Sequence, residues 1–323
     1  MSVYIPRTTL KLRVRLMVKG YIIKRKEEPE PAPPEEEKYK IERLPTGLKP
    51  LDDGLEGGIP LGSWVVISGE PGTGKTVLTQ HVATSALDHD YGVVIVSTEL
   101  KKWEWVQQAK GLGLNVDKYP IVRLKDIIEY DRQKNEYFVQ LDKAPKDFRT
   151  IFIDIYTLSY LARLMGITER AEKEKRARWY SYLDVPVLAE AVDLSFRLFA
   201  DKPEEKYYNL TRNMLLIVDS LSLFYIRAPS LAAKIALDLA LRFKRNNVVA
   251  LLTAHYAQTT GSTFGFRVEH IADGVIHLWM ENVEATKEVR RHLIVKKMRM
   301  TEHRLKSYKV MIEKGRGIVL EPE

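Results

Sequence analysis

The chain has 323 residues, a formal net charge of +8, 45% hydrophobic residues and no cysteine. This length leaves room for one large domain or two small ones. The lack of cysteine excludes disulfides, thiolate zinc sites and a cysteine nucleophile. No apolar run is long enough to span a membrane, and the N-terminal residues lack the apolar core of a secretion signal. We therefore expect a cytoplasmic protein with no membrane contact.

The excess positive charge is concentrated in residues 1–26, which contain eight basic residues and no acidic one. The eight are Arg7, Lys11, Arg13, Arg15, Lys19, Lys24, Arg25 and Lys26. Residues 9–18 alternate apolar and basic side chains, which predicts a β-strand with one buried and one charged face. This basic β arm either contacts nucleic acid or an acidic partner, or it is a solvated edge strand.

Residues 27–40 form the next segment and are rich in proline and glutamate. This composition predicts an extended, self-repelling linker. We therefore expect the main domain to cover residues 41–323.

A phosphate-binding loop organises this domain. The sequence Gly69-Glu70-Pro71-Gly72-Thr73-Gly74-Lys75-Thr76 matches the pattern G-x-x-x-x-G-K-[ST] at every defined position. An apolar strand precedes it at Trp64–Ser68, and a segment with helical spacing of apolar residues follows it at Val77–Ala83. This strand–loop–helix context favours a nucleotide site over a glycine-rich turn that fits the pattern by accident.

The expected chemistry follows from the geometry of such a loop. Its glycines let backbone N–H groups turn toward a phosphate, and the helix N-terminus adds partial positive charge. We expect Lys75 to reach the β- and γ-phosphates of ATP, and the Thr76 hydroxyl to bind Mg²⁺. The predicted nucleotide contacts run from Gly69 to Val77.

Further apolar strands alternate with helices, which predicts an α/β fold with a mostly parallel, doubly wound sheet. The strands are expected at Gly92–Ser97, Arg149–Ile155, Met214–Ser220, Val248–Thr253 and Gly274–Trp279. Residues 157–185 are expected to be helical and heavily charged, and the family resemblance described below implies that they are an insertion. A basic-apolar β-hairpin is expected over Arg290–Met300 and Tyr308–Glu313.

Polar residues that directly follow these strands are candidates for the chemistry, because ligands bind beyond the carboxyl ends of parallel strands. Asp219 is the predicted second Mg²⁺ position, with Asp154 as its rival or as a turn-capping acid. Glu99 is the predicted group that activates water, and its alternative role is a helix N-terminal acid. His255 either senses the γ-phosphate or is an ordinary residue at a strand end.

These motifs also carry a family resemblance. The series Thr46-Gly47, Leu51-Asp52, Gly57–Gly62, the phosphate loop, Val93–Glu99, Ile153-Asp154, Val218–Ser220, Val268–Ile276 and Lys297–His303 resembles KaiC and RadA proteins of the RecA superfamily. The resemblance covers about residues 44–320 and is closer to KaiC. Leu100 stands where KaiC often has a second glutamate, and Met300 replaces a common glycine.

The resemblance implies a RecA-like core that uses ATP and Mg²⁺, with Glu99 on the catalytic glutamate. It also implies rings, usually hexameric, with ATP between subunits.

The strand period places Leu293, Val295, Lys297 and Arg299 on one side of a strand. On residues alone the two cations suit either a polyphosphate or a solvated edge. By resemblance, Lys297 and Arg299 reach the γ-phosphate held by the neighbouring subunit.

Three functions remain open at this point. The first is a ring ATPase that couples hydrolysis to a partner. The second is a RadA-like paralogue in recombination or repair, which binds DNA through the loop 258–267. The third is a nucleotide-gated binding protein with little turnover.

Overall fold

The computed structural model describes residues 41–131, 133, 136–174, 183–227, 229–255, 270–281 and 287–323. The predicted basic arm, the whole linker 27–40, residues 175–182 of the charged segment and the loop 258–267 therefore lie outside the described residues.

A ten-stranded sheet forms the centre of the fold, in the order β14-β13-β12-β11-β3-β10-β9-β4-β8-β5. Its parallel part comprises β5 (Ile121–Arg123), β8 (Thr150–Asp154), β4 (Gly92–Ser97), β9 (Met214–Asp219), β10 (Val248–His255), β3 (Trp64–Gly69) and β11 (Gly274–Met280). Three antiparallel strands extend it: β12 (Arg291–Met298), β13 (Tyr308–Glu313) and β14 (Gly317–Pro322). The expected mostly parallel α/β sheet is confirmed.

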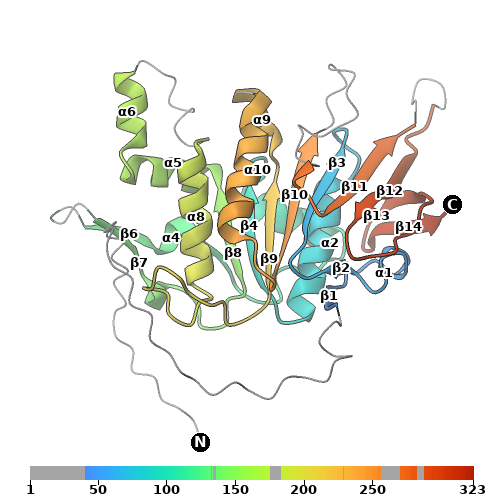
Figure 1. Ribbon diagram of the computed structural model, residues 1–323, viewed down its shortest axis with the longest axis horizontal. Coiled ribbons are helices and arrows are strands. Elements are labelled where there is room, and N and C mark those ends of the chain that lie inside the picture. The colour runs from blue at the N-terminus through green and yellow to red at the C-terminus, as the bar shows by residue number, and fades with distance from the viewer. Residues whose placement is uncertain are drawn as a thin grey trace, which may run out of the picture.

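Helices cover both faces of the parallel strands, because residues along each strand alternate between two hydrophobic layers (Figure 1). On β3, Val65 and Ile67 pack with α2 (Lys75–Asp88), while Trp64 and Val66 face the opposite layer. That opposite layer is built by α5 (Ile155–Leu164), α8 (Val185–Arg197), α9 (Ser222–Arg227) and α10 (Pro229–Phe243). The side of α2 also holds α1 (Lys49–Asp53) and α3 (Lys102–Gly111). Strands buried on both faces explain the continuous apolar runs in the sequence.

Smaller elements decorate this core. They are β1 (Arg43–Leu44), β2 (Ile59–Pro60), α4 (Leu124–Ile127), β6 (Ile128–Asp131), β7 (Glu136–Val139), the 3₁₀ turn Leu141–Lys143 and α6 (Ile167–Lys173). The strand β5, the β6–β7 hairpin and β14 are not predicted from the sequence. Each of these strands has at most six residues, so a periodic pattern has little length in which to show itself.

The pairing of β12 with β11 corrects one expectation. The register shifts between Val275 and Ile276, since Val275 lies opposite Lys297 whereas Ile276 lies opposite Val295. The irregularity breaks the two-residue period. As a result Met298, rather than Lys297, joins Leu293 and Val295 in the hydrophobic layer.

A buried histidine joins the helix after the phosphate loop to the last strand. His81 of α2 accepts a hydrogen bond at Nε2 from the backbone N–H of Ile318 in β14, at 2.7 Å. The imidazole lies so close to Gly317 that a Cβ atom on this residue would be 2.2 Å from Nε2. Only glycine therefore fits at this position. Burial lowers the pKa of His81 from 6.5 to about 4, so the folded protein holds this imidazole neutral.

We expect acid to destabilise the protein through His81. In the unfolded chain the imidazole takes up a proton near its ordinary pKa of 6.5, whereas the folded protein resists protonation down to about 4. The contribution of neutral His81 to the free energy of unfolding is therefore fully present above pH 6.5. It falls as the pH drops toward 4, by at most about 3 kcal/mol. Urea unfolding across this range measures it. His81→Asn retains an acceptor without titrating, so equal pH dependence in both proteins would contradict the assignment.

Candidate nucleotide site

Four neighbouring strands bring the predicted site residues to one edge of the sheet. The strands β3, β10, β9 and β4 are adjacent. The phosphate loop follows β3, His255 ends β10, Asp219 ends β9 and Glu99 follows β4. The carboxyl edge thus gathers residues that are far apart in the chain, as expected for this class of sheet.

The phosphate loop has the geometry needed to surround an anion. Gly72 and Gly74 have φ angles of 81° and 103°, which an L side chain adopts only with strain. The α2 helix begins at Lys75. The Lys75 ammonium donates to the carbonyls of Gly69 at 3.0 Å and Glu70 at 2.7 Å. Burial lowers its pKa to about 8, so this cation lies desolvated inside the loop.

Asp219 lies beside the loop and is 3% exposed. Its Oδ1 accepts a hydrogen bond from the Thr253 hydroxyl at 2.5 Å, and Thr76 also hydrogen-bonds to it. Burial raises the pKa of this carboxyl. A hydroxyl and a carboxylate held together at the mouth of the loop are oxygen donors, which Mg²⁺ prefers. The residues present therefore fit the predicted metal position.

Glu99 is the second carboxylate at this edge. Its Oε1 accepts a hydrogen bond from the Ser220 hydroxyl at 2.7 Å and lies 3.4 Å from Nε2 of His255. The hydrogen bond from His255 is the main cause that lowers the pKa of Glu99. The carboxylate is thus ionised and oriented by two neighbours, and it can accept a proton.

Asp154 occupies a different position from its rival Asp219. It ends β8, which lies beyond β4, and it caps α5 by accepting hydrogen bonds from the N–H and hydroxyl of Thr157, both at 2.8 Å. Its capping role accounts for a buried acid at this strand end. The geometry favours Asp219.

Lys297 and Arg299 lie at the other edge of the sheet. Because β12 is antiparallel, its end at Met298 faces Gly274, the first residue of β11. Arg299 Nη1 pairs with Asp273 at 3.1 Å, and Lys297 Nζ donates to the Ala272 carbonyl at 2.6 Å. Both cations are roughly 15 Å from the phosphate loop along the strands, so neither reaches the loop of its own subunit.

Met300, which stands where the resemblance led us to expect glycine, lies in a turn with a positive φ angle. Its φ angle is 57°, in the left-handed region that costs an L residue about 1–2 kcal/mol. Arg43 donates to its carbonyl at 3.0 Å. The substitution therefore alters the residue without removing the turn.

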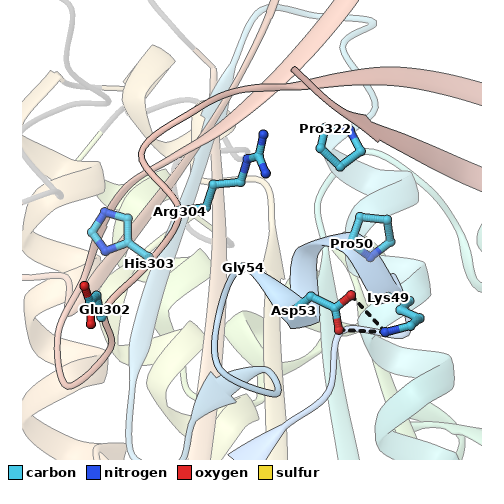
Figure 2. Close-up of a pocket in the computed structure, with 8 residues that line it drawn as sticks. All are labelled: Lys49, Pro50, Asp53, Gly54, Glu302, His303, Arg304 and Pro322. Carbon is cyan, nitrogen blue, oxygen red and sulfur yellow. Dashed lines mark hydrogen bonds and ion pairs between the residues drawn. The ribbon is translucent and has the colours of Figure 1, made fainter.

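A hollow of about 720 Å³ lies apart from the phosphate loop (Figure 2). It is lined from α1, from residues 302–304 and from Pro322 at the end of β14, and the Lys49–Asp53 ion pair lies within it. The phosphate loop contributes no residue to it. This hollow and the nucleotide edge are thus separate features of the subunit.

Three residues near the loop were not predicted as site residues. Ser220 holds Glu99, Thr253 holds Asp219, and Arg291 of β12 donates to the carbonyl of Gly72 at 3.0 Å. Ser220 follows Asp219 directly, so its position in the sequence was a usable signal. Thr253 and Arg291 depend on strand pairing, which no local pattern reveals.

This combination of a phosphate loop, two strand-end acids and a mostly parallel sheet defines a P-loop protein with a RecA-like fold. The chain belongs to the KaiC ATPase family, whose model matches residues 44–159 and 205–323. The unmatched stretch between them contains α6 and α8.

Individual proteins are also similar to this chain. A UPF0273 protein from Thermotoga maritima is 27% identical over 87% of this chain and 97% of its own length. An archaeal flagellar ATP-binding protein FlaH from Methanocaldococcus jannaschii is 38% identical over 24% of this chain and 34% of its own. The crystal structure of a KaiC-like protein from Pyrococcus horikoshii has a TM-score of 0.55 at 20% identity, covering 88% of this chain and all of that one. Within the described residues, no helix has the length and apolar character to cross a bilayer.

Proposed function

We propose that the protein binds Mg·ATP at the phosphate loop and hydrolyses it. The observation that carries this proposal is the convergence of Lys75, Asp219 and Glu99 at one edge of the sheet. The family supports nucleotide chemistry, and the arrangement of two carboxylates around a buried lysine supports turnover rather than binding alone.

Each residue has a distinct part in the proposed site. Lys75 and the loop N–H groups bind the phosphates, while Thr76 and Asp219 hold Mg²⁺. The bound ion would neutralise phosphate charge. Glu99 accepts the proton of the attacking water, and Ser220 and His255 fix its orientation. His255 thereby connects to the nucleotide through Glu99.

We further propose that the site is completed by a neighbouring subunit. Lys297 and Arg299 lie at the edge opposite the phosphate loop, so they can meet a γ-phosphate only in another copy. A head-to-tail arrangement of this kind closes into a ring when the rotation permits. Six subunits are the number that the family resemblance implies.

Lys75→Ala tests the nucleotide site. We expect the variant to lose tight ATP binding and to keep its fold, because it removes the loop cation that would bind the β- and γ-phosphates and leaves the buried apolar residues of the sheet unchanged. Melting curves with and without Mg·ATP measure both properties, since a bound ligand raises the melting temperature. Lys202→Ala, at an exposed ion pair with Glu205, is the control. An undiminished ATP-dependent shift in Lys75→Ala would contradict the assignment.

The rate of ATP hydrolysis, measured with and without single-stranded DNA, distinguishes the proposed function from the two alternatives. The proposed ATPase hydrolyses ATP without DNA, whereas a protein dedicated to DNA recombination requires single-stranded DNA for a high rate. The contact loop 258–267 lies outside the described residues, so its role in DNA binding stays a prediction. Tight ATP binding without hydrolysis would instead support a nucleotide-gated binding protein.

A further inference from the structure

A cleft with exposed aromatic rings lies beside the nucleotide edge. It consists of two hollows of about 440 and 400 Å³ that share Lys102 and Trp103. Lys101, Lys125 and Tyr156 also line the first hollow. The cleft is formed where β4, β8 and β5 end, so it continues the carboxyl edge of the sheet past Glu99. We call these five residues the Trp103 cleft.

The two aromatic rings of the cleft are about half exposed to solvent. Trp103 is 59% exposed and Tyr156 is 47% exposed. By contrast Trp105, on the same helix, is fully buried and packs edge-on against Phe152 at 6.1 Å. The core contact of α3 is therefore made by Trp105. A large ring left in water at Trp103 is available to a ligand.

Cations accompany these rings. Lys101 Nζ lies 5.7 Å from the centre of the Tyr156 ring, and Lys125 Nζ lies 5.6 Å from that of Tyr160. Lys102 donates to the carbonyl of Ile121 at 3.3 Å. Among the described residues, none of these three lysines forms an ion pair. The charge of Arg123, by contrast, is compensated by Asp126 and Asp154.

We propose that the Trp103 cleft binds single-stranded nucleic acid. Bases stack on Trp103 and Tyr156, and the three lysines bind the phosphates between them. Stacking rings that alternate with cations are the means by which proteins bind single strands without reading sequence. The two hollows meet at Trp103, which suits consecutive nucleotides better than a single one. This proposal is independent of ATP hydrolysis and of the loop 258–267.

The first test measures binding of a fluorescein-labelled oligothymidylate to the full chain without ATP, by anisotropy. We expect Trp103→Ala to weaken binding by roughly 5- to 150-fold, the loss associated with one stacked base. Trp103→Phe, which keeps a ring, should retain most of the affinity. Tyr207→Ala is the matched control, because Tyr207 is 76% exposed with Lys206 Nζ 5.1 Å from its ring but lies outside the cleft.

A second measurement separates phosphate contacts from stacking. Lys102→Gln and Lys125→Gln should each reduce the salt dependence of binding by about 0.7 in the log–log slope, as expected for one lost phosphate contact to a single strand. Trp103→Ala should leave that slope nearly unchanged. Melting curves of all variants establish that they are folded.

Five results would overturn the proposal. They are no binding of oligothymidylate by the unaltered chain, equal affinity in Trp103→Ala and the unaltered chain, and equal losses in Trp103→Ala and Tyr207→Ala. The fourth is displacement of the strand by oligoglutamate at equal charge, which would mark the cleft as a site for an acidic peptide. The fifth is displacement by thymidine monophosphate at equal nucleotide concentration, which would replace the strand with a free mononucleotide as the ligand.

Discussion

Replacing Arg299 by alanine should leave ATP binding intact and lower turnover by roughly 10³–10⁵-fold, the effect of removing an arginine that stabilises transition-state charge. The Arg299 side chain is 56% exposed, and it lies at the edge of the sheet opposite the phosphate loop. Steady-state hydrolysis and nucleotide binding, measured together, separate the two effects. We expect Lys297→Ala to be similarly impaired.

The fold should survive this change. The Asp273 side chain is buried, and it keeps its hydrogen bonds from the Trp64 N–H at 2.9 Å and from Lys244 at 2.6 Å when Arg299 is removed, so no buried charge is left without a partner. Arg242→Ala is the matched control, since Arg242 is 57% exposed and pairs with Asp238. An equal fall in turnover in both variants would remove Arg299 from the site.

Mixing two inactive variants tests donation between subunits. Lys75→Ala lacks its own site but can supply Arg299, whereas Arg299→Ala has an intact site that needs a donor. Some interfaces in the mixture are complete, so measurable activity should return. If both variants assemble and exchange subunits but the mixture stays inactive, the two cations do not act between subunits.

Glu99→Gln should bind Mg·ATP and turn over at least ~100-fold more slowly, the scale of a lost general base. The amide keeps the size of the side chain but cannot accept a proton. Single-turnover hydrolysis beside nucleotide binding measures the change, with the exposed Glu321→Gln as control. A rate close to that of the unaltered protein would assign the base elsewhere.

The acid limb of the pH–rate profile provides a second check on Glu99. The hydrogen bond from His255 holds the pKa of Glu99 below its ordinary value of 4.5. The carboxylate therefore remains a base until the pH falls below 4.5. In His255→Ala this limb should move to higher pH, because the main cause of the lowered pKa is gone. An unmoved limb would show that Glu99 does not produce it.

The nucleotide edge was predictable because its chemistry is encoded locally. The phosphate loop is contiguous, and Glu99 and Asp219 directly follow strands whose apolar runs are visible in the sequence. The order of parallel strands then brings them together without any knowledge of side-chain packing. The placement of these residues could be foreseen, although their roles stay predictions.

Other contacts could not be foreseen, since they depend on which strands pair and in what register. Thr253 reaches Asp219 because β10 lies beside β9, and Arg291 reaches Gly72 because β12 extends the sheet. The irregular pairing of β11 with β12 likewise separates Lys297 from Leu293 and Val295, against the simple two-residue period. Pairing between distant segments leaves no local signal.

The position of β3 also determines when the nucleotide loop can form during synthesis. This strand is made early, but both of its neighbours, β10 and β11, come from residues 248–280. The loop itself contacts residues made later still, since Ile312 packs on Gly74 and Arg291 bonds to Gly72. Contacts of such long sequence separation form slowly. A growing chain therefore carries its phosphate loop with both edges of β3 unpaired until residues 248–280 have been made.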